Sequence, residues 1–213
     1  MNTLKQRIVA QLRAGDWDGL IATIRVDRKA WSHLIRALYL PDEFVGWRAA
    51  EGFGRAVAML ADSDTETCRE MFRRLFWALN DESGTSGRRV APAVGEAVAR
   101  RPDVFGEYAL IIWPALEEPF LQASVAWALG RIGQVDPELV RKAVPDLVSL
   151  LDSPDHEVRG HAAWALGEIG VREAAEKIAA LAGDAGEMKI FLAGELRRVT
   201  VGALARTALR KLM

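Results

Sequence analysis

The residues best suited to metal chemistry lie in one short segment. His156 and His161 flank Glu157 and Arg159. Zinc binding by two histidines on a helix needs a spacing of four residues, which puts both imidazoles on one face. Here the spacing is five, which separates the two side chains by about 140°. Glu157 and His161 share a face, but two ligands do not close a metal site. We therefore expect a solvated first helical turn and no metal.

Nucleophilic chemistry has little support. Cys68 follows Thr67 and precedes Arg69, without a histidine nearby in sequence. The chain has no Gly-x-Ser-x-Gly elbow. The spacing of Gly84 and Gly87 is too short for a phosphate-binding loop of the nucleotide-binding type. We predict no catalytic residue and no cofactor. Because the chain has one cysteine, it can form neither an internal disulfide nor a cysteine zinc cluster, which favours a reducing compartment.

The polar stretch 80–89 is the best local candidate for binding. It places Asp81 and Glu82 before two glycines, and Arg88 and Arg89 at the start of a helix. Unpaired N–H groups at a helix N-terminus, together with two guanidinium groups, could hold an anion. The two acids could instead neutralise the arginines, and the stretch could simply be a solvated loop between repeats.

Tryptophan is the second candidate, because the chain has seven Trp beside two Tyr. On a helix over 121–132, one buried stripe is formed by Leu121, Val125, Leu129 and Ile132. Trp127 lies more than about 140° from the middle of that stripe, with Arg131 beside it. Trp164, flanked by His161 and Glu168, occupies the same place in a later segment. These indoles could form an exposed aromatic ladder, with Trp77 as a third rung, or could wedge between helices as core.

Nearly every segment that must position these residues has helical periodicity. Leu4, Ile8 and Leu12 form one stripe that Gly15 ends, and Asp16 can cap the next helix. Asp42 opens a long segment through Ala61, with a break near Gly52 and Gly54 as one option. Further helices are expected near 28–40, 64–79, 88–100, 103–116, 119–132, 137–151, 155–168 and 171–182.

An internal repeat relates two of these segments. Shifted by 37 residues, 121–133 aligns with 158–170 at seven identical positions of thirteen, including Trp-Ala-Leu-Gly and a closing Ile-x-Gly. A weaker copy lies at 45–54. Small alanines would let neighbouring helices approach, while leucine and isoleucine fill the layer between them. This pattern indicates a solenoid of helix pairs.

The segment 150–170 resembles a HEAT repeat of the prokaryotic type first grouped with phycobilisome lyases. Asp155, Val158 and Arg159 match its pattern, whereas Gln122 departs from it in the preceding repeat. The stretch 77–84 also resembles a block in bacterial and archaeal HEAT proteins, although 85–89 departs from it. The resemblance implies an all-α, right-handed HEAT-like α-solenoid, whose second helices line a concave face.

The C-terminal region departs from helical periodicity. Residues 188–192 and 196–201 flank Ala193, Gly194 and Glu195, which predicts a short β-hairpin with glycine at the turn. We expect it to cap the open end of the solenoid; a partner-binding edge strand is the alternative. The chain then forms a single domain over 1–213, with divergent helices at 1–41, repeats at 42–182, and the hairpin plus a capping helix at 183–213.

Charge and hydropathy restrict the class of partner. Lys and Arg number 28 against 29 Asp and Glu, a net charge of -1 with a pI near 6.3. A dedicated nucleic-acid binder or a polybasic membrane-surface protein needs a surplus of basic residues. The N-terminus lacks the apolar core of a signal peptide, and the longest uncharged runs reach about half the length of a membrane span. We expect a cytoplasmic protein.

These observations favour a non-enzymatic scaffold that binds a protein partner on the concave face. The residues assigned to binding are Trp77, Asp81, Glu82, Arg88, Arg89, Trp127, Arg131, His161, Trp164 and Glu168. Two alternatives stay open by resemblance. HEAT-like folds resemble those of the alkylpurine DNA glycosylases, whose concave surface is basic, and the repeat type resembles that of lyases that attach a tetrapyrrole chromophore.

Overall fold

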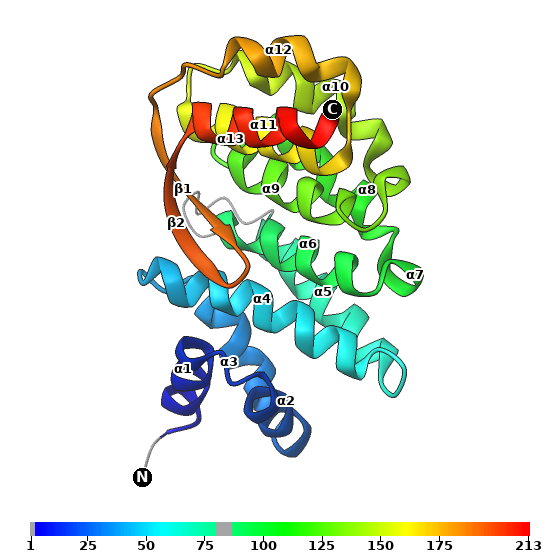
Figure 1. The fold of residues 1–213 in the computed structure, drawn as a ribbon. Coiled ribbons are helices and arrows are strands. Elements are labelled where there is room, and N and C mark those ends of the chain that lie inside the picture. The colour runs from blue at the N-terminus through cyan, green and yellow to red at the C-terminus, as the bar shows by residue number, and fades with distance from the viewer. Residues whose placement is uncertain (1–2, 80–86) are drawn as a thin grey trace.

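Helices stacked in two layers form the protein. The computed structural model describes residues 3–79 and 87–213. Neighbouring helices of an inner layer pack side by side along the molecule (Figure 1). This layer consists of α4 (Glu43–Leu60), α6 (Val90–Arg100), α9 (Gln122–Gly133), α11 (His156–Ile169) and α13 (Val201–Leu212). The outer layer consists of α5 (Thr65–Leu79), α7 (Pro102–Phe105), α8 (Tyr108–Ile112), α10 (Val144–Ser149) and α12 (Ala175–Ala180), extended by short 3-10 turns. The predicted α-solenoid is confirmed.

Glycine on the inner helices sets how closely they approach. A Cβ added at Gly130 would lie 2.8 Å from the Cα of Ala165, and one added at Gly95 would lie 2.8 Å from the Cα of Ala128. Real Cβ atoms do not approach so closely, so each glycine lets the next helix lie against its backbone. The contact between Gly167 and Ala208 continues the same arrangement.

The divergent N-terminal residues form α1 (Leu4–Ala14), α2 (Trp17–Val26) and α3 (Lys29–Ala37), which pack on α4. Gly15 ends α1 with a φ of 66°, and Asp16 caps α2 through the amide of Gly19, as predicted. The option of a break in α4 is wrong, because α4 runs unbroken through both glycines. A Cβ at Gly52 would lie 3.0 Å from the side chains of Leu12 and Leu20, so this glycine admits the N-terminal helices.

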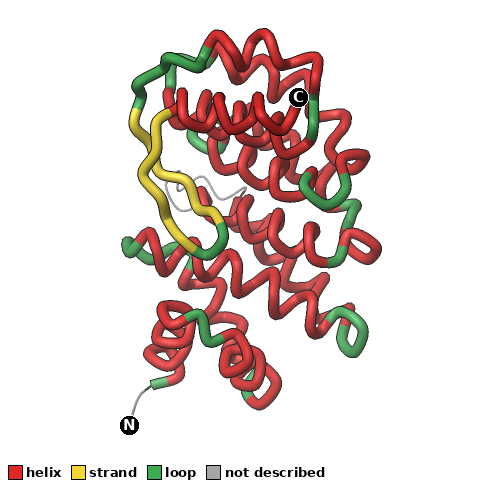
Figure 2. Tube along the Cα trace, in the orientation of Figure 1, coloured by secondary structure: helices red, strands yellow, loops and turns green. Residues whose placement is uncertain are grey.

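The C-terminal hairpin is confirmed, although its placement differs from the expected end cap. Strands β1 (Glu187–Leu192) and β2 (Glu195–Thr200) pair antiparallel, with Leu192 opposite Glu195. Ala193 and Gly194, at φ 50° and 82°, form the two-residue turn. The hairpin reaches from α13 along the inner layer to α4 (Figures 1 and 2). The end of the solenoid is instead covered by α12 and α13.

Within residues 3–79 and 87–213, no helix combines the length and the apolar character that crossing a membrane requires.

Candidate functional site

Three indole rings form a row on the face of the inner layer that points away from the outer helices, here called the concave face. Trp47, Trp127 and Trp164 come from α4, α9 and α11. The rings of Trp127 and Trp164 lie 5.9 Å apart at an interplanar angle of 15°, which is a stacked pair. Trp47 meets Trp127 edge-on at 4.9 Å. The repeat-equivalent tryptophans therefore do line up.

The hairpin covers this aromatic row. Phe191 of β1 stacks on Trp47 at 5.4 Å and 8°, and its carbonyl oxygen accepts a 2.9 Å hydrogen bond from the indole Nε1 of Trp127. Trp127 and Trp164 consequently retain exposed fractions of only 2% and 4%. The exposed-ladder alternative is wrong for these two residues. The helical wheel placed both indoles off the buried stripe, as observed, but a wheel contains no information on a cover from the distant hairpin.

A groove lies beside the hairpin turn, with a volume of 510 Å³. Four arginine and two glutamate side chains line it, so the lining carries two more positive than negative groups. Trp127, Trp164 and the hairpin residues Phe191 to Gly194 form the neighbouring wall. The charged residues, here called the arginine groove, are Arg48, Glu51, Arg55, Glu96, Arg100 and Arg131.

The two glutamates organise the arginine groove. Glu51, 6% exposed, lies 3.3 Å from Arg48 and 2.9 Å from Arg55. Glu96, 5% exposed, lies 3.0 Å from Arg100 and 3.1 Å from Arg131. Buried carboxylates need such partners, because an isolated charge is costly to remove from water. Arg100 also lies 3.9 Å from Glu51. Each glutamate therefore holds at least two guanidinium groups in place, and the network spans α4, α6 and α9.

Trp17 closes the groove from the N-terminal helices. The guanidinium carbons of Arg48 and Arg55 lie 5.4 and 4.9 Å from its ring centroid, within the range of a cation–π interaction. A Cβ at Gly194 of the hairpin turn would lie 3.0 Å from Nη1 of Arg48. Arg48 thus sits between Trp17 and the hairpin turn, and its Nε is buried without a hydrogen-bond partner among the described residues.

The predicted binding residues separate into several places. Arg131 lies in the arginine groove, and Glu168 pairs with Lys211 of α13. Trp77 is 76% exposed but belongs to α5 of the outer layer, so it is not a third rung of the ladder. Asp81 and Glu82 lie outside the described residues. The binding role of each of these residues stays a prediction.

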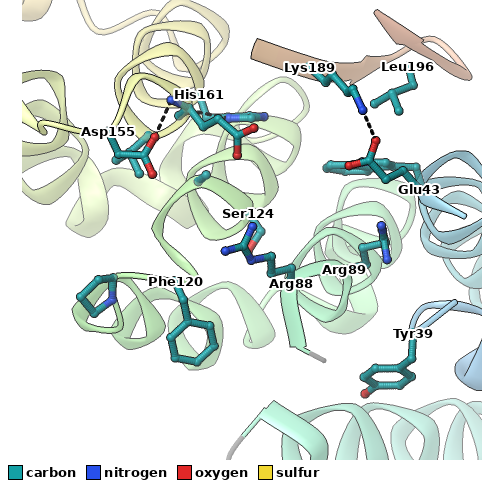
Figure 3. Close-up of a pocket in the computed structure, with 15 residues that line it drawn as sticks. Tyr39, Glu43, Arg88, Arg89, Phe120, Ser124, Asp155, His161, Lys189 and Leu196 are labelled. Carbon is teal, nitrogen blue, oxygen red and sulfur yellow. Dashed lines mark hydrogen bonds and ion pairs between the residues drawn. The ribbon is translucent and has the colours of Figure 1, made fainter. Parts of the chain in front are cut away.

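A second cavity, of 340 Å³, lies where the inner helices begin (Figure 3). Its lining comes from the first turns of α4, α9 and α11, from the residues just before α6, and from both strands. Arg89 donates 3.2 Å hydrogen bonds to the carbonyl oxygens of Leu38 and Leu40, so it ties α6 to the end of α3. Arg88 is exposed, and Lys189 pairs with Glu43 across the cavity. The lining includes Glu43, Trp47, Arg88, Phe120, Asp155, Glu157, His161, Lys189 and Leu196.

His161 lies in the wall of this second cavity and not on an exposed helix surface. It is 4% exposed, and burial lowers the pKa of its imidazole to about 4. The imidazole is therefore neutral at pH 7.

The described residues contain neither a cluster of metal ligands nor a thiol that is ionised at neutral pH. No group of three or more His, Cys, Asp or Glu side chains there could hold a metal ion. Burial raises the pKa of the Cys68 thiol to about 11, so this cysteine is not a thiolate at neutral pH.

Five of the six groove residues were missed by sequence reasoning, although a signal existed. Arg48, Glu51 and Arg55 are spaced i, i+3 and i+7, which places them on one helical face. Glu96, like Arg131 and Glu168, directly follows a glycine that contacts the next helix. Charged residues at equivalent positions of successive repeats predict a row of ion pairs between neighbouring helices.

Family models match residues 119–184 of the chain. Residues 119–169 match the HEAT-like repeat, and residues 158–184 match the PBS lyase HEAT-like repeat. An uncharacterized protein of Archaeoglobus fulgidus is 33% identical over 128 residues. This alignment covers 60% of the present chain and 64% of that protein, so the chain matches less than two thirds of its relative's length.

One solved structure shares the fold at a TM-score above 0.5. An engineered protein from the Northeast Structural Genomics Consortium superposes with a TM-score of 0.58 at 19% identity, covering 98% of this chain and 52% of that one. An archaeal HEAT-like repeats protein from Thermococcus onnurineus gives a TM-score of 0.47 at 17% identity, covering 98% and 80% of the two chains. The first likeness concerns the fold alone, and the second is too distant to support an argument.

Proposed function

Because the chain carries HEAT-like repeats of the phycobilisome-lyase type within an α-solenoid, we propose that it is a non-enzymatic scaffold that binds an acidic segment of a protein partner on its concave face. Fold alone does not fix a function, so the proposal depends on the chemistry of that face. The observation that carries it is the arginine groove, where four guanidinium groups converge around two carboxylates.

The arrangement suits recognition of carboxylates. The guanidinium group is planar and presents five N–H donors that match a carboxylate in pairs of hydrogen bonds. Arg48, Arg100 and Arg131 retain side-chain exposures of 18%, 23% and 21%, so each is positioned by packing yet open on one side. Glu51 and Glu96 hold these side chains in place before any partner arrives, which lowers the entropy lost on binding.

The partner would bind beside the hairpin and not on the aromatic row. The row is occupied by Phe191, whereas the groove opens next to Ala193 and Gly194 at the hairpin turn. Trp17 adds an aromatic surface at the opposite side of Arg48 and Arg55. Arginine and tryptophan are the residue types that most often dominate the energy of protein interfaces.

A protein partner is favoured over nucleic acid because of the charges in and around the groove. Binding to phosphate backbones draws on many basic side chains at once. Here Glu51 and Glu96 reduce the excess to two positive groups, and the whole chain has a net charge of -1. A short acidic peptide segment needs only this local excess.

The test compares two pairs of substitutions that remove equal charge. Arg55→Gln with Arg100→Gln leaves Glu51 beside Arg48 and Glu96 beside Arg131, so both carboxylates stay paired while the excess positive charge of the groove is removed. Arg73→Gln with Arg74→Gln removes two arginines from the outer helix α5 and is the control.

Both variants and the parent protein are immobilised, and proteins captured from the native host are quantified at low and high salt. We expect one partner to be lost in the groove variant, retained in the α5 variant, and displaced by an oligoglutamate peptide but not by duplex DNA. Equal capture by the two variants would contradict the proposal. Displacement by DNA with a steep salt dependence would favour the nucleic-acid alternative instead.

A further inference from the structure

The two arginines that pair with Glu51 each keep one nitrogen unused. Arg48 donates from Nη1 to Oε2 of Glu51 at 3.3 Å, and its Nη2 has no hydrogen-bond partner among the described residues. Arg55 donates from Nε and Nη2 to Oε1 of Glu51 at 3.0 and 2.9 Å, and its Nη1 has no partner there either. Both carboxylate oxygens of Glu51 are therefore occupied, while each arginine retains a free donor group.

The same arrangement recurs at Glu96. Arg100 contacts Oε2 of Glu96 from Nε and Nη2, at 3.1 and 3.0 Å. Arg131 donates from Nε to Oε1 of Glu96 at 3.1 Å, and from Nη1 to the side chain of Gln134 at 3.2 Å. Within the described residues this leaves Nη1 of Arg100 and Nη2 of Arg131 without a partner. The arginine groove thus has one free Nη nitrogen on each arginine, and every carboxylate oxygen of its two glutamates already accepts a donor.

These free nitrogens are accessible to a ligand. In the described part of the chain, Nε of Arg48 is the sole nitrogen of the four groove arginines that is buried without a hydrogen-bond partner. The four free Nη nitrogens also lack a partner but are not buried, so each of them has accessible surface. Arg55 keeps 35% of its side chain exposed, and all four arginines line the groove. A ligand in the groove therefore meets donors that Glu51 and Glu96 already hold in position.

Arg100 lies at the centre of the cluster. Its Nη2 is 3.9 Å from Oε1 of Glu51, the same oxygen that Nη2 of Arg55 contacts at 2.9 Å. Arg100 and Arg131 share Glu96. Burial lowers the pKa of the Arg100 guanidinium, and the positive charges of Arg55 and Arg131 act in the same direction. The two glutamates leave two positive charges in excess, so a further anion that joins the cluster is stabilised beside Arg100.

The number of charges and donors distinguishes between kinds of anion. A phosphorylated serine or threonine carries about −1.5 to −2 charge at pH 7 and three acceptor oxygens on one small group. A carboxylate has one charge and two acceptor oxygens, and each phosphate of a nucleic-acid backbone has one charge. Two such groups would have to be held close together against their own repulsion. One phosphomonoester group matches the excess charge of the groove by itself.

We propose that the acidic segment recognised by the arginine groove carries a phosphorylated serine or threonine, whose phosphoryl group binds between Arg55, Arg100 and Arg131. The inference rests on the proposed function, because it names the group that the same site recognises. The phosphoryl oxygens accept hydrogen bonds from the free Nη nitrogens. The flanking peptide lies against Trp17 and the hairpin turn, which line the groove.

The test measures the binding of three labelled heptapeptides to the full chain by fluorescence anisotropy. The peptides share flanks of glycine and glutamate and differ in the central residue, which is phosphoserine, glutamate or serine. We expect the phosphoserine peptide to bind at least about tenfold more tightly than the glutamate peptide, because it adds a charge and an acceptor oxygen. The serine peptide should bind most weakly.

Arg100→Gln should remove most of this difference. The substitution leaves each glutamate of the groove with at least one other arginine. We expect the phosphoserine peptide to lose at least about tenfold in affinity, and its preference over the glutamate peptide to fall below about threefold. Arg100→Lys retains the charge without the planar fork and should give an intermediate affinity. Arg73→Gln, on the outer helix α5, is the control and should bind like the parent protein.

The phosphorus NMR signal of the phosphoserine peptide gives a readout on the unaltered protein. We expect this signal to shift on addition of the parent protein and to stay in place with the Arg100→Gln protein. Inorganic phosphate identifies the source of the phosphoryl group. It should displace the phosphoserine peptide only at concentrations at least about tenfold above those of the unlabelled peptide, because it lacks the flanking residues. Equal competition would overturn the proposal in favour of a free anion, and stronger competition by duplex DNA would overturn it in favour of nucleic acid.

The failure of this inference differs from the failure of the proposed function. Equal affinity for the phosphoserine and glutamate peptides, both weakened by Arg100→Gln, would overturn phosphate recognition and support recognition of an acidic segment. A phosphoserine peptide that binds the Arg100→Gln protein as tightly as the parent protein would overturn the site itself. Absence of binding by all three peptides at about 1 mM would also overturn the inference, whereas the scaffold proposal is decided by the capture of a partner from the host.

Discussion

The indole Nε1 of Trp127 donates a 2.9 Å hydrogen bond to the carbonyl oxygen of Phe191, which joins the middle of the inner layer to the C-terminal hairpin. Both residues are buried, at 2% exposure each. Through this contact the hairpin covers the tryptophans that the internal repeat places in line, and its residues line both the arginine groove and the His161 cavity.

Replacing Trp127 with phenylalanine should loosen the hairpin. The ring stays aromatic, but the carbonyl of Phe191 loses its donor in a buried position, which we expect to lower the free energy of unfolding by about 1–3 kcal/mol. Urea unfolding measures the loss, and hydrogen exchange should quicken in β1 and β2. Trp77→Phe, at a 76% exposed position, should change the stability by less than about 0.5 kcal/mol. Equal effects of the two substitutions would refute the account of the hairpin.

Adding one methyl group at Gly130 should be costly. The new Cβ would lie 2.7 Å from the ring of Trp164 and 2.8 Å from the Cα of Ala165, so α9 and α11 must separate. We expect Gly130→Ala to lower the free energy of unfolding by about 1–3 kcal/mol. Gly183→Ala is the matched control, because a Cβ there meets nothing within 4 Å. Thermal unfolding of both variants checks the prediction, and a Gly130→Ala protein as stable as its control would be inconsistent with the close packing of the inner helices.

Glu96 and Arg131 should be energetically coupled. The two side chains lie 3.1 Å apart and, counting side-chain atoms alone, are 7% and 21% exposed. Arg131→Gln leaves a buried carboxylate with one partner fewer, and we expect it to cost about 1–3 kcal/mol of stability. Combining it with Glu96→Gln should cost less than the sum of the single changes, with a coupling above about 0.5 kcal/mol in a double-mutant cycle. Additive effects would mean that Glu96 does not position Arg131.

Acid should destabilise the protein in part through His161. Burial holds the pKa of this imidazole at about 4, below its ordinary value of 6.5, so the unfolded chain binds the proton more readily. The contribution is fully present above about pH 6.5 and is lost as the pH falls toward 4. Urea midpoints at pH 7 and pH 4.5 should therefore fall more for the parent protein than for His161→Phe. A parallel fall in both proteins would show that His161 is not buried in its neutral form.

The fold was predictable because its determinants are local and repeated. The 37-residue shift, the helical periodicity and the glycine at the hairpin turn each specify one element and its neighbour. The end of α1 at Gly15 and the start of α2 at Asp16 were likewise predictable from residue type alone. Such patterns require no knowledge of contacts between distant parts of the chain.

The candidate site was less predictable because it depends on contacts that are distant in sequence. Phe191 covers Trp127 from 64 positions away, and no helical wheel of α9 contains that contact. Trp17 meets Arg48 only because the divergent N-terminal helices pack on α4. The sequence presents His161 as a poorly spaced metal ligand and as a neighbour of Trp164, whereas its burial in a cavity wall follows only from the tertiary structure.

Site-specific photocrosslinking tests the central claim of partner binding in the arginine groove most directly. A benzophenone side chain is placed at Gln134, an exposed residue that lines the groove beside Arg131, and in a separate protein at Arg141, which is exposed on a 3-10 turn of the outer layer. We predict that the Gln134 protein crosslinks one partner through an acidic segment, and that the Arg55→Gln, Arg100→Gln background abolishes the crosslink. A partner captured at Arg141 alone, or a Gln134 crosslink that survives the loss of both arginines, would contradict the claim.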